Sequence, residues 1–267
     1  MSNTKRTPAV AGMFYPANAH ELQSMVTNFL RETKASIGPV PKAIIAPHAG
    51  YIYSGPIAAS VYAQITPAHD TITKVVLLGP SHQVPFSGLA ASSMQEFATP
   101  LGNIPLDRQA IDDILPLPQV SVLEQAHANE HSLEVQLPFL QEVLEDFTLI
   151  PLVVGEATKE QVGEVLEKLW GGAETLIVIS SDLSHYLEYN AAQKMDKLTS
   201  TAIEELRPEN IHSEQACGRN PINGLLHIAR NRGMQAQTVD LRNSGDTASD
   251  ITGSKDQVVG YGAYVFN

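Results

Sequence analysis

The fold of this chain is decided by residues 74–82, which have the sequence KVVLLGPSH. The apolar residues 75–78 show no polar alternation, and this is typical of a strand that is covered on both faces of a sheet. Gly79 and Pro80 end the run, and Ser81 and His82 follow directly. We therefore predict a buried strand whose carboxyl end carries polar side chains.

Similar apolar runs recur along the chain and alternate with helical patterns. Further strands are expected at 42–46, 149–154, 175–180 and 258–266. Amphipathic helices are expected at 18–30, 159–169, 190–206 and 221–232, and loops at 115–119 and 243–255. Strands that alternate with helices predict an α/β layered fold with a largely parallel sheet. Because no repeat or linker interrupts the pattern, we expect residues 1–267 to form a single domain.

Composition and charge exclude several classes of protein. The chain has 267 residues, with 17 Lys+Arg against 29 Asp+Glu, a formal net charge of -12. This balance disfavours a basic surface for nucleic acid. A single cysteine excludes an internal disulfide framework and a cysteine-only metal site. No apolar run approaches the ~20 residues of a membrane span, and no secretory signal is recognisable. We therefore expect a cytoplasmic protein that acts without nucleic acid or membrane.

Three of the predicted strands each deliver a histidine to their carboxyl end. His48 follows the strand at 42–46, His82 follows the one at 74–78, and His185 follows the one at 175–180. Ligands of open α/β sheets bind in the crevice outside these strand ends. Imidazole is both a common ligand for transition metals and the usual acid or base near neutral pH. Each histidine taken singly fits a hydrogen-bonded loop residue better, but the threefold repetition favours a shared site.

The chain's one cysteine lies just before the predicted helix at 221–232. A helix N-terminus and the neighbouring Arg219 would favour the thiolate of Cys217 over its thiol. The alternative is a buried, inert side chain. As a thiolate, Cys217 could complete a metal site with His48 and His82. Asp182, in the loop before His185, fits a carboxylate that orients a histidine, or else an Asx-type turn.

Residues 127–131 formally match the H-x-x-E-H signature of a metalloprotease. That mechanism needs both histidines on one helix, yet the apolar helical pattern begins only after His131, and Pro138 interrupts it. We therefore expect His127 in a loop and disfavour the protease. Glu130 and His131 could instead face the crevice of the other histidines. No G-x-S-x-G, Walker or G-x-G-x-x-G motif supports a serine hydrolase or a nucleotide-binding fold.

Five ordered motifs resemble those of the Memo family, whose prokaryotic members are called AmmeMemoRadiSam system protein B. The motifs are Ala46-Pro47-His48-Ala49-Gly50-Tyr51, Gly79-Pro80-Ser81-His82, Glu130-His131-Ser132, Ser181-Asp182-Leu183-Ser184-His185 and Cys217-Gly218-Arg219. This family is similar to the class III extradiol dioxygenases, which are non-haem iron enzymes. The resemblance implies a three-layer α/β/α fold with a mostly parallel or mixed sheet. It also implies a metal at His48, His82 and Cys217.

The resemblance further implies a redox or oxygenase-related activity that depends on iron or copper, with zinc as another option. In this hypothesis His185 acts as acid or base with Asp182 orienting it, and His131 lines the same pocket. The expected ligand-binding residues are Tyr51, Ser81, Glu130 and Arg219. The dioxygenases use a carboxylate where Cys217 would stand, so a softer thiolate replaces the third ligand.

Two other functions are compatible with the same residues. The crevice could bind a small molecule, a peptide or a protein without catalysis, and the family name suggests a radical-SAM partner. Alternatively, two histidines and one cysteine suit a catalytic zinc, with Glu130 as the base of a hydrolase.

Overall fold

The computed structural model describes residues 4–33, 38–247 and 255–267. One mixed sheet has the strand order β10-β12-β2-β9-β3-β8-β4-β7, with β11 paired to β12. Its strands are β2 (Ala43–Ala46), β3 (Lys74–Pro80), β4 (Leu89–Ala91), β7 (Val120–Val122), β8 (Thr148–Val154), β9 (Thr175–Ser180), β10 (His185–Leu187), β11 (Ala236–Asn243) and β12 (Val258–Phe266). The central strands β2, β9, β3 and β8 run parallel, whereas β12 pairs antiparallel with β2, and β4 pairs antiparallel with β8 but parallel with β7.

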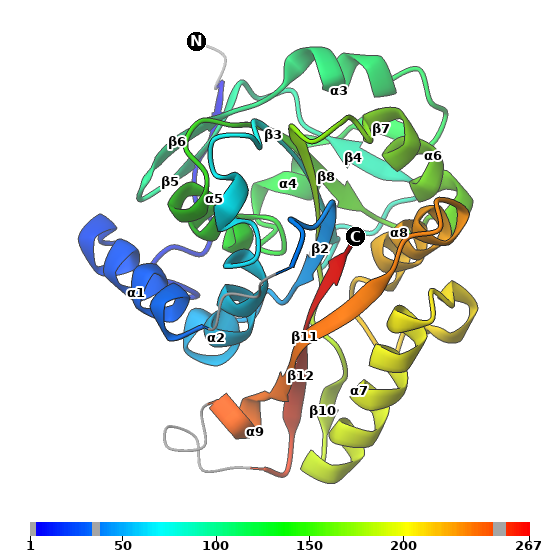
Figure 1. Ribbon diagram of the computed structural model, residues 1–267. Coiled ribbons are helices and arrows are strands. Elements are labelled where there is room, and N and C mark those ends of the chain that lie inside the picture. The colour runs from blue at the N-terminus through cyan, green and yellow to red at the C-terminus, as the bar shows by residue number, and fades with distance from the viewer. Residues whose placement is uncertain (1–3, 34–37, 248–254) are drawn as a thin grey trace.

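Helices cover both faces of this sheet (Figure 1). On one side lie α1 (Ala19–Glu32), α2 (Tyr51–Tyr62) and α5 (Leu137–Val143), with α2 against β2, β11 and β12. On the other side lie α6 (Lys159–Leu169), α7 (Tyr189–Glu204) and α8 (Arg219–Asn231). There, α7 packs on β11 and β12, and α8 packs on β3 and β9. The fold is therefore a three-layer α/β/α sandwich, as expected.

The remaining elements are short and lie around the sandwich. A small second sheet joins β1 (Lys5–Arg6), β5 (Glu96–Thr99) and β6 (Gly102–Pro105). Short helices are α3 (Arg108–Ile114), α4 (Glu124–Ala128) and α9 (Ser244–Thr247). Single 3-10 turns occur at η1 (Thr66–Ala68), η2 (Glu134–Gln136) and η3 (Pro208–Asn210). In the described ranges, no helix combines the length and the apolar character that a bilayer crossing requires.

The predicted strands and helices are confirmed with shifts of a few residues, and two local predictions need correction. His127 lies in α4 rather than in a loop. The segment at 243–255 contains α9, and its residues 248–254 lie outside the described part of the chain. The prediction omitted α2 because this helix is apolar on nearly all sides, which hides the helical period. Asn18 caps α1 as expected, since its side chain accepts a hydrogen bond from the Glu21 amide.

Candidate metal centre

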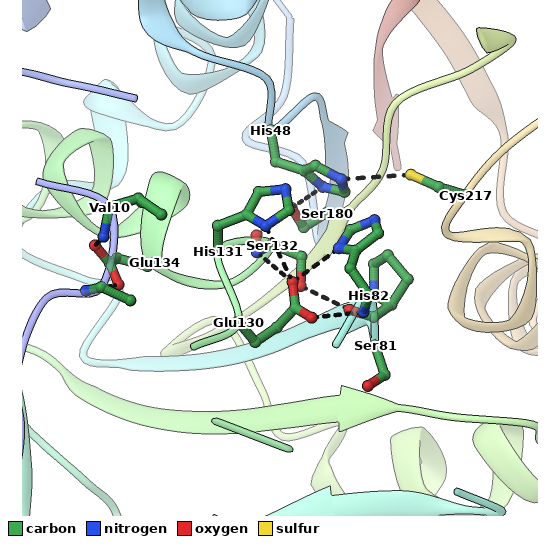
Figure 2. A network of polar contacts seen from close by, with 12 residues as sticks. Val10, His48, Ser81, His82, Glu130, His131, Ser132, Glu134, Ser180 and Cys217 are labelled. Carbon is green, nitrogen blue, oxygen red and sulfur yellow. Dashed lines mark hydrogen bonds and ion pairs between the residues drawn. The ribbon is translucent and has the colours of Figure 1, made fainter. Parts of the chain in front are cut away.

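The carboxyl ends of the parallel strands β2 and β3, which flank β9, bring two of the predicted histidines together. In the order β2-β9-β3, His48 lies two residues after β2, and His82 lies two residues after β3. A third imidazole, His131, comes from the loop between α4 and η2. Gly79 lets this loop approach, because a Cβ at that position would lie 2.8 Å from the Ser132 Oγ. The three side chains converge at one edge of the sheet (Figure 2).

The three imidazoles have the spacing of a metal-binding group. Their ring centroids are 5.2 Å apart for His48 and His82, 5.5 Å for His48 and His131, and 4.6 Å for His82 and His131. Each ring offers one nitrogen, and these nitrogens all lie within 4.8 Å of one another. Burial, together with the neighbouring histidines, lowers the pKa of His48 and of His131. Both rings are therefore neutral near pH 7, which is the form that binds metals.

The hydrogen bonds of Ser180 determine which nitrogen of His48 is free. The Ser180 hydroxyl donates to the Ser132 carbonyl at 2.5 Å, so its oxygen can only accept from the His48 Nδ1, 2.8 Å away. Gln136 Nε2 donates to the same oxygen at 2.8 Å. The His48 Nδ1 therefore carries the proton, and its Nε2 keeps a lone pair, with the Cys217 Sγ 3.4 Å away.

Glu130 determines which nitrogen of His82 is free. The Glu130 Oε1 lies 2.8 Å from the His82 Nδ1, and its Oε2 accepts from the His82 amide at 2.6 Å. The Oε1 also accepts from the Ser132 amide at 2.9 Å and lies 3.5 Å from the His131 Nδ1. Burial alone would raise the pKa of Glu130, but the hydrogen bonds from His82 and Ser132 lower it to about 2. Glu130 is thus a buried carboxylate that orients two of the imidazoles.

Cys217 lies next to the imidazole of His48. Its Sγ lies 3.4 Å from the His48 Nε2. The approach depends on Gly218, because a Cβ there would lie 2.6 Å from the Ser181 Cβ. Burial and the charge of Asp182 raise the pKa of the Cys217 thiol to about 12. The expectation that Arg219 favours the thiolate is therefore wrong in this structure, since Arg219 pairs instead with Glu156 at 3.2 Å.

Asp182 and His185 occupy the loop after β9. The Asp182 Oδ1 accepts from the His48 amide at 2.8 Å, so this carboxylate fixes the backbone of His48 rather than the ring of His185. Burial raises the pKa of Asp182 to about 6, although the His48 amide opposes this shift. The His185 Nδ1 lies 2.8 Å from the Leu183 carbonyl, to which it must donate. In the neutral ring, the Nε2 of His185 is consequently the hydrogen-bond acceptor.

A cleft of about 470 Å³ opens beside these residues. We call it the ligand cleft. It is lined by Met13, Phe14, Ala49, Gly50, Tyr53, His131, Asp182, His185, Tyr186, Ser244, Gln257, Val259 and Tyr261. Aromatic rings form much of this wall, and His131, Asp182 and His185 supply imidazole and carboxylate groups. The cleft therefore combines aromatic surface with polar groups, a lining that suits an organic ligand.

The other predicted ligand-binding residues lie elsewhere. Tyr51 is only 1% exposed, and its hydroxyl donates to the Val135 carbonyl at 2.7 Å. It is thus placed in the core under the site. The Ser81 hydroxyl donates to the Val84 carbonyl at 2.6 Å and shapes its own loop. Neither these two residues nor Arg219 lines the ligand cleft.

A buried ion pair that sequence reasoning missed supports the loop of Glu130 and His131. The Arg6 guanidinium donates to the Glu134 carboxylate at 2.8 Å, to the Glu130 carbonyl at 2.7 Å and to the His127 carbonyl at 2.8 Å. Glu134 also accepts from the Tyr15 hydroxyl at 2.6 Å and from the amides of residues 9 and 10. No local pattern indicates this network, because its partners lie more than a hundred residues apart in the sequence.

Known proteins resemble this chain along nearly its whole length. The MEMO1 family protein of Aquifex aeolicus is 39% identical, with 98% of each chain covered. That of Aeropyrum pernix is 38% identical over 97% of this chain and 98% of its own. The crystal structure of the uncharacterized protein JW3007 from Escherichia coli K12 has a TM-score of 0.53 and 13% identity. It covers 84% of this chain and 98% of its own, and it supports the fold alone.

The family model described as Memo-like protein matches residues 6–265. This range contains the three imidazoles, Cys217 and the loop of Asp182 and His185. With that match and relatives above 30% identity over almost the full length, the chain belongs to the Memo-like protein family.

Proposed function

We propose that this chain binds one transition-metal ion at its imidazole group and uses it in redox chemistry related to that of oxygenases. The observation that carries the proposal is the directed pair of lone pairs on His48 and His82. Ser180 and Glu130 hold the Nδ1 of these rings, so the Nε2 atoms keep their lone pairs in a group whose ligand nitrogens lie within 4.8 Å of one another. Outer partners of this kind accompany histidine ligands of metals.

His48 and His82 would hold the ion, and His131 and Cys217 would be further donors. Three imidazoles and a thiol suit iron or copper, and they also accept zinc. When bound, the metal would supply a Lewis acid and a site for electron transfer. The extradiol dioxygenases have a carboxylate as their third metal ligand, and here Cys217 would take its place. The softer sulfur donor would make the centre more electron-rich.

The residues around the ion have separate tasks in this proposal. His185 has a free Nε2 in the wall of the ligand cleft, and it would accept or return a proton of the bound ligand. Asp182 would keep the His48 loop in place through the His48 amide. The aromatic residues of the cleft would exclude water from a small organic molecule or a peptide side chain.

A zinc hydrolase with Glu130 as its base is less well supported. Glu130 is 1% exposed, and its carboxylate already accepts hydrogen bonds from His82 and Ser132. A base must take up a proton from water, yet the pKa of this carboxyl is lowered to about 2. The same cleft could also bind a ligand without catalysis, and the experiment below distinguishes this function from the metal-dependent one.

The test is the metal content of protein purified without oxygen, with the element identified by mass spectrometry. We expect one iron or copper ion per chain in the wild type and a loss of metal in His82→Ala. His69→Ala is the matched control, because the His69 side chain is 49% exposed and, in the described part of the chain, forms an ion pair with Glu145. Equally low metal in the wild type and His82→Ala would refute the proposal. Ligand binding that survives complete metal removal would favour the non-catalytic module.

A further inference from the structure

A second cleft reaches the same centre from another side. Its volume is about 500 Å³, and its lining consists of His82, His185, Leu187, Met195, Ser213, Glu214 and Cys217. The lining of this second cleft and that of the ligand cleft have only His185 in common. His131 and Asp182 thus face one cleft, whereas His82 and Cys217 face the other. His185 stands between the two.

The lining of the second cleft differs chemically from that of the ligand cleft. It contains no aromatic residue other than its two histidines. Glu214 is exposed and offers a carboxylate, and the half-buried Met195 offers a thioether. Beyond them lie the His82 imidazole and the Cys217 thiol. Carboxylate, thioether, imidazole and thiol are all donors for transition-metal cations, and the last three suit soft or borderline ions.

We propose that the second cleft is the route by which the metal ion enters and leaves the centre, separate from the cleft that takes the organic ligand. The inference rests on the proposed metal-binding function. Glu214 would attract the cation, and the Met195 thioether would bind it transiently before it reaches His82 and Cys217. Separation of the two routes lets the metal exchange without passing through the ligand cleft.

His185 can separate the two clefts because hydrogen bonds within its loop and to two neighbouring elements hold the loop in place. Its Nδ1 donates to the Leu183 carbonyl at 2.8 Å. The Leu183 amide donates to the Gly260 carbonyl at 2.8 Å, and the Gly260 amide donates to the Ser184 carbonyl at 2.8 Å. From α7, the Asp196 carboxylate accepts from the Ser184 amide at 3.0 Å. These bonds fix the loop to β12 and α7, so the loop that separates the two clefts is part of the framework.

The single cysteine makes this route directly measurable. Methyl methanethiosulfonate, a small uncharged thiol reagent, can label only Cys217 in this chain. Met195→Trp fills the second cleft, and Met13→Trp places the same bulk in the ligand cleft as a matched control. Ser213→Trp, in an exposed position of the second cleft, serves as an independent blocking variant should Met195→Trp fold poorly. A second readout is the rate at which Zn²⁺-loaded protein releases its ion to a chromophoric chelator.

We expect Met195→Trp and Ser213→Trp to slow both labelling and Zn²⁺ release about tenfold, which corresponds to about 1.4 kcal/mol in the barrier. The Zn²⁺ stoichiometry at equilibrium should stay unchanged, and Met13→Trp should match the wild type in both rates. Slower rates in Met13→Trp, with wild-type rates in the second-cleft variants, would overturn the route. Wild-type protein that takes up neither Zn²⁺ nor iron nor copper, although Cys217 is labelled through the second cleft, would instead overturn the metal-binding function.

Discussion

Removing the buried cation of Arg6 is expected to be among the most destabilising single changes near the centre. Arg6 and Glu134 form an ion pair at 2.8 Å, with side-chain exposures of 5% and 0%. The substitution Arg6→Met keeps a long apolar side chain but leaves the Glu134 carboxylate without its counter-ion. It also removes the donor from the carbonyls of His127 and Glu130.

The magnitude follows from this burial. Breaking a buried pair by removing one partner costs about 3–5 kcal/mol, because the remaining charge stays desolvated. Tyr15 and two backbone amides still donate to Glu134, which keeps the loss within this range rather than above it. A domain of ordinary stability, about 5–15 kcal/mol, would lose a large share of its free energy of unfolding. The loop of Glu130 and His131 should loosen as well, and metal affinity should fall with it.

The assay is urea unfolding followed by circular dichroism, combined with a Zn²⁺ titration of the folded protein. Arg207→Met is the matched control, because Arg207 pairs with Glu205 at 3.2 Å with exposures of 54% and 47%. An exposed pair contributes about 0–1 kcal/mol, so this variant should resemble the wild type. If Arg6→Met loses no more stability than Arg207→Met, then the network does not hold the loop and the reasoning fails.

Three further changes test the surroundings of the centre. Glu130→Gln should weaken Zn²⁺ binding about 10–100-fold, because it weakens the acceptor for the His82 ring; unchanged affinity in a competition titration would exclude that role. Gly260→Ala would bring its Cβ into the Asp196 carboxylate and should cost about 1–3 kcal/mol in urea unfolding, partly recovered by Asp196→Ala in the same chain. Burial raises the pKa of Asp196 above 3.8, so the contribution of Asp196 to wild-type stability should fall as pH rises from 3.8 through the raised value. Asp196→Asn should flatten that part of the profile, and parallel stability profiles of the two proteins would contradict this assignment.

The parts of the fold that could be predicted from the sequence are those with a local signal. Strands β2, β3, β8 and β9 are short apolar runs without alternation, and each is buried in the sheet. Because parallel strands expose their carboxyl ends at one edge, the approach of His48 to His82 followed from strand positions alone. The same logic placed the loop of Asp182 and His185 beside them.

Other features depend on contacts that no local pattern records. The helix α2 is apolar on nearly all sides, which hides its helical period, and Tyr51, for which the family resemblance implies ligand binding, is buried in the core. The role of Ser180 follows from a hydrogen bond to Ser132, which lies 48 residues away. The raised pKa of the Cys217 thiol reflects burial beside Asp182, which the proximity of Arg219 in sequence could not indicate.

The central claim is that the imidazoles of His48, His82 and His131 surround a metal ion. The most direct measurement is anomalous X-ray scattering from crystals of protein purified and grown without oxygen, recorded on both sides of the iron and copper edges. The account predicts a single anomalous peak among the three rings, with metal–nitrogen distances of about 2.0–2.1 Å. Crystals of such protein that show no anomalous peak among these rings, or that show a peak only elsewhere on the chain, would contradict it.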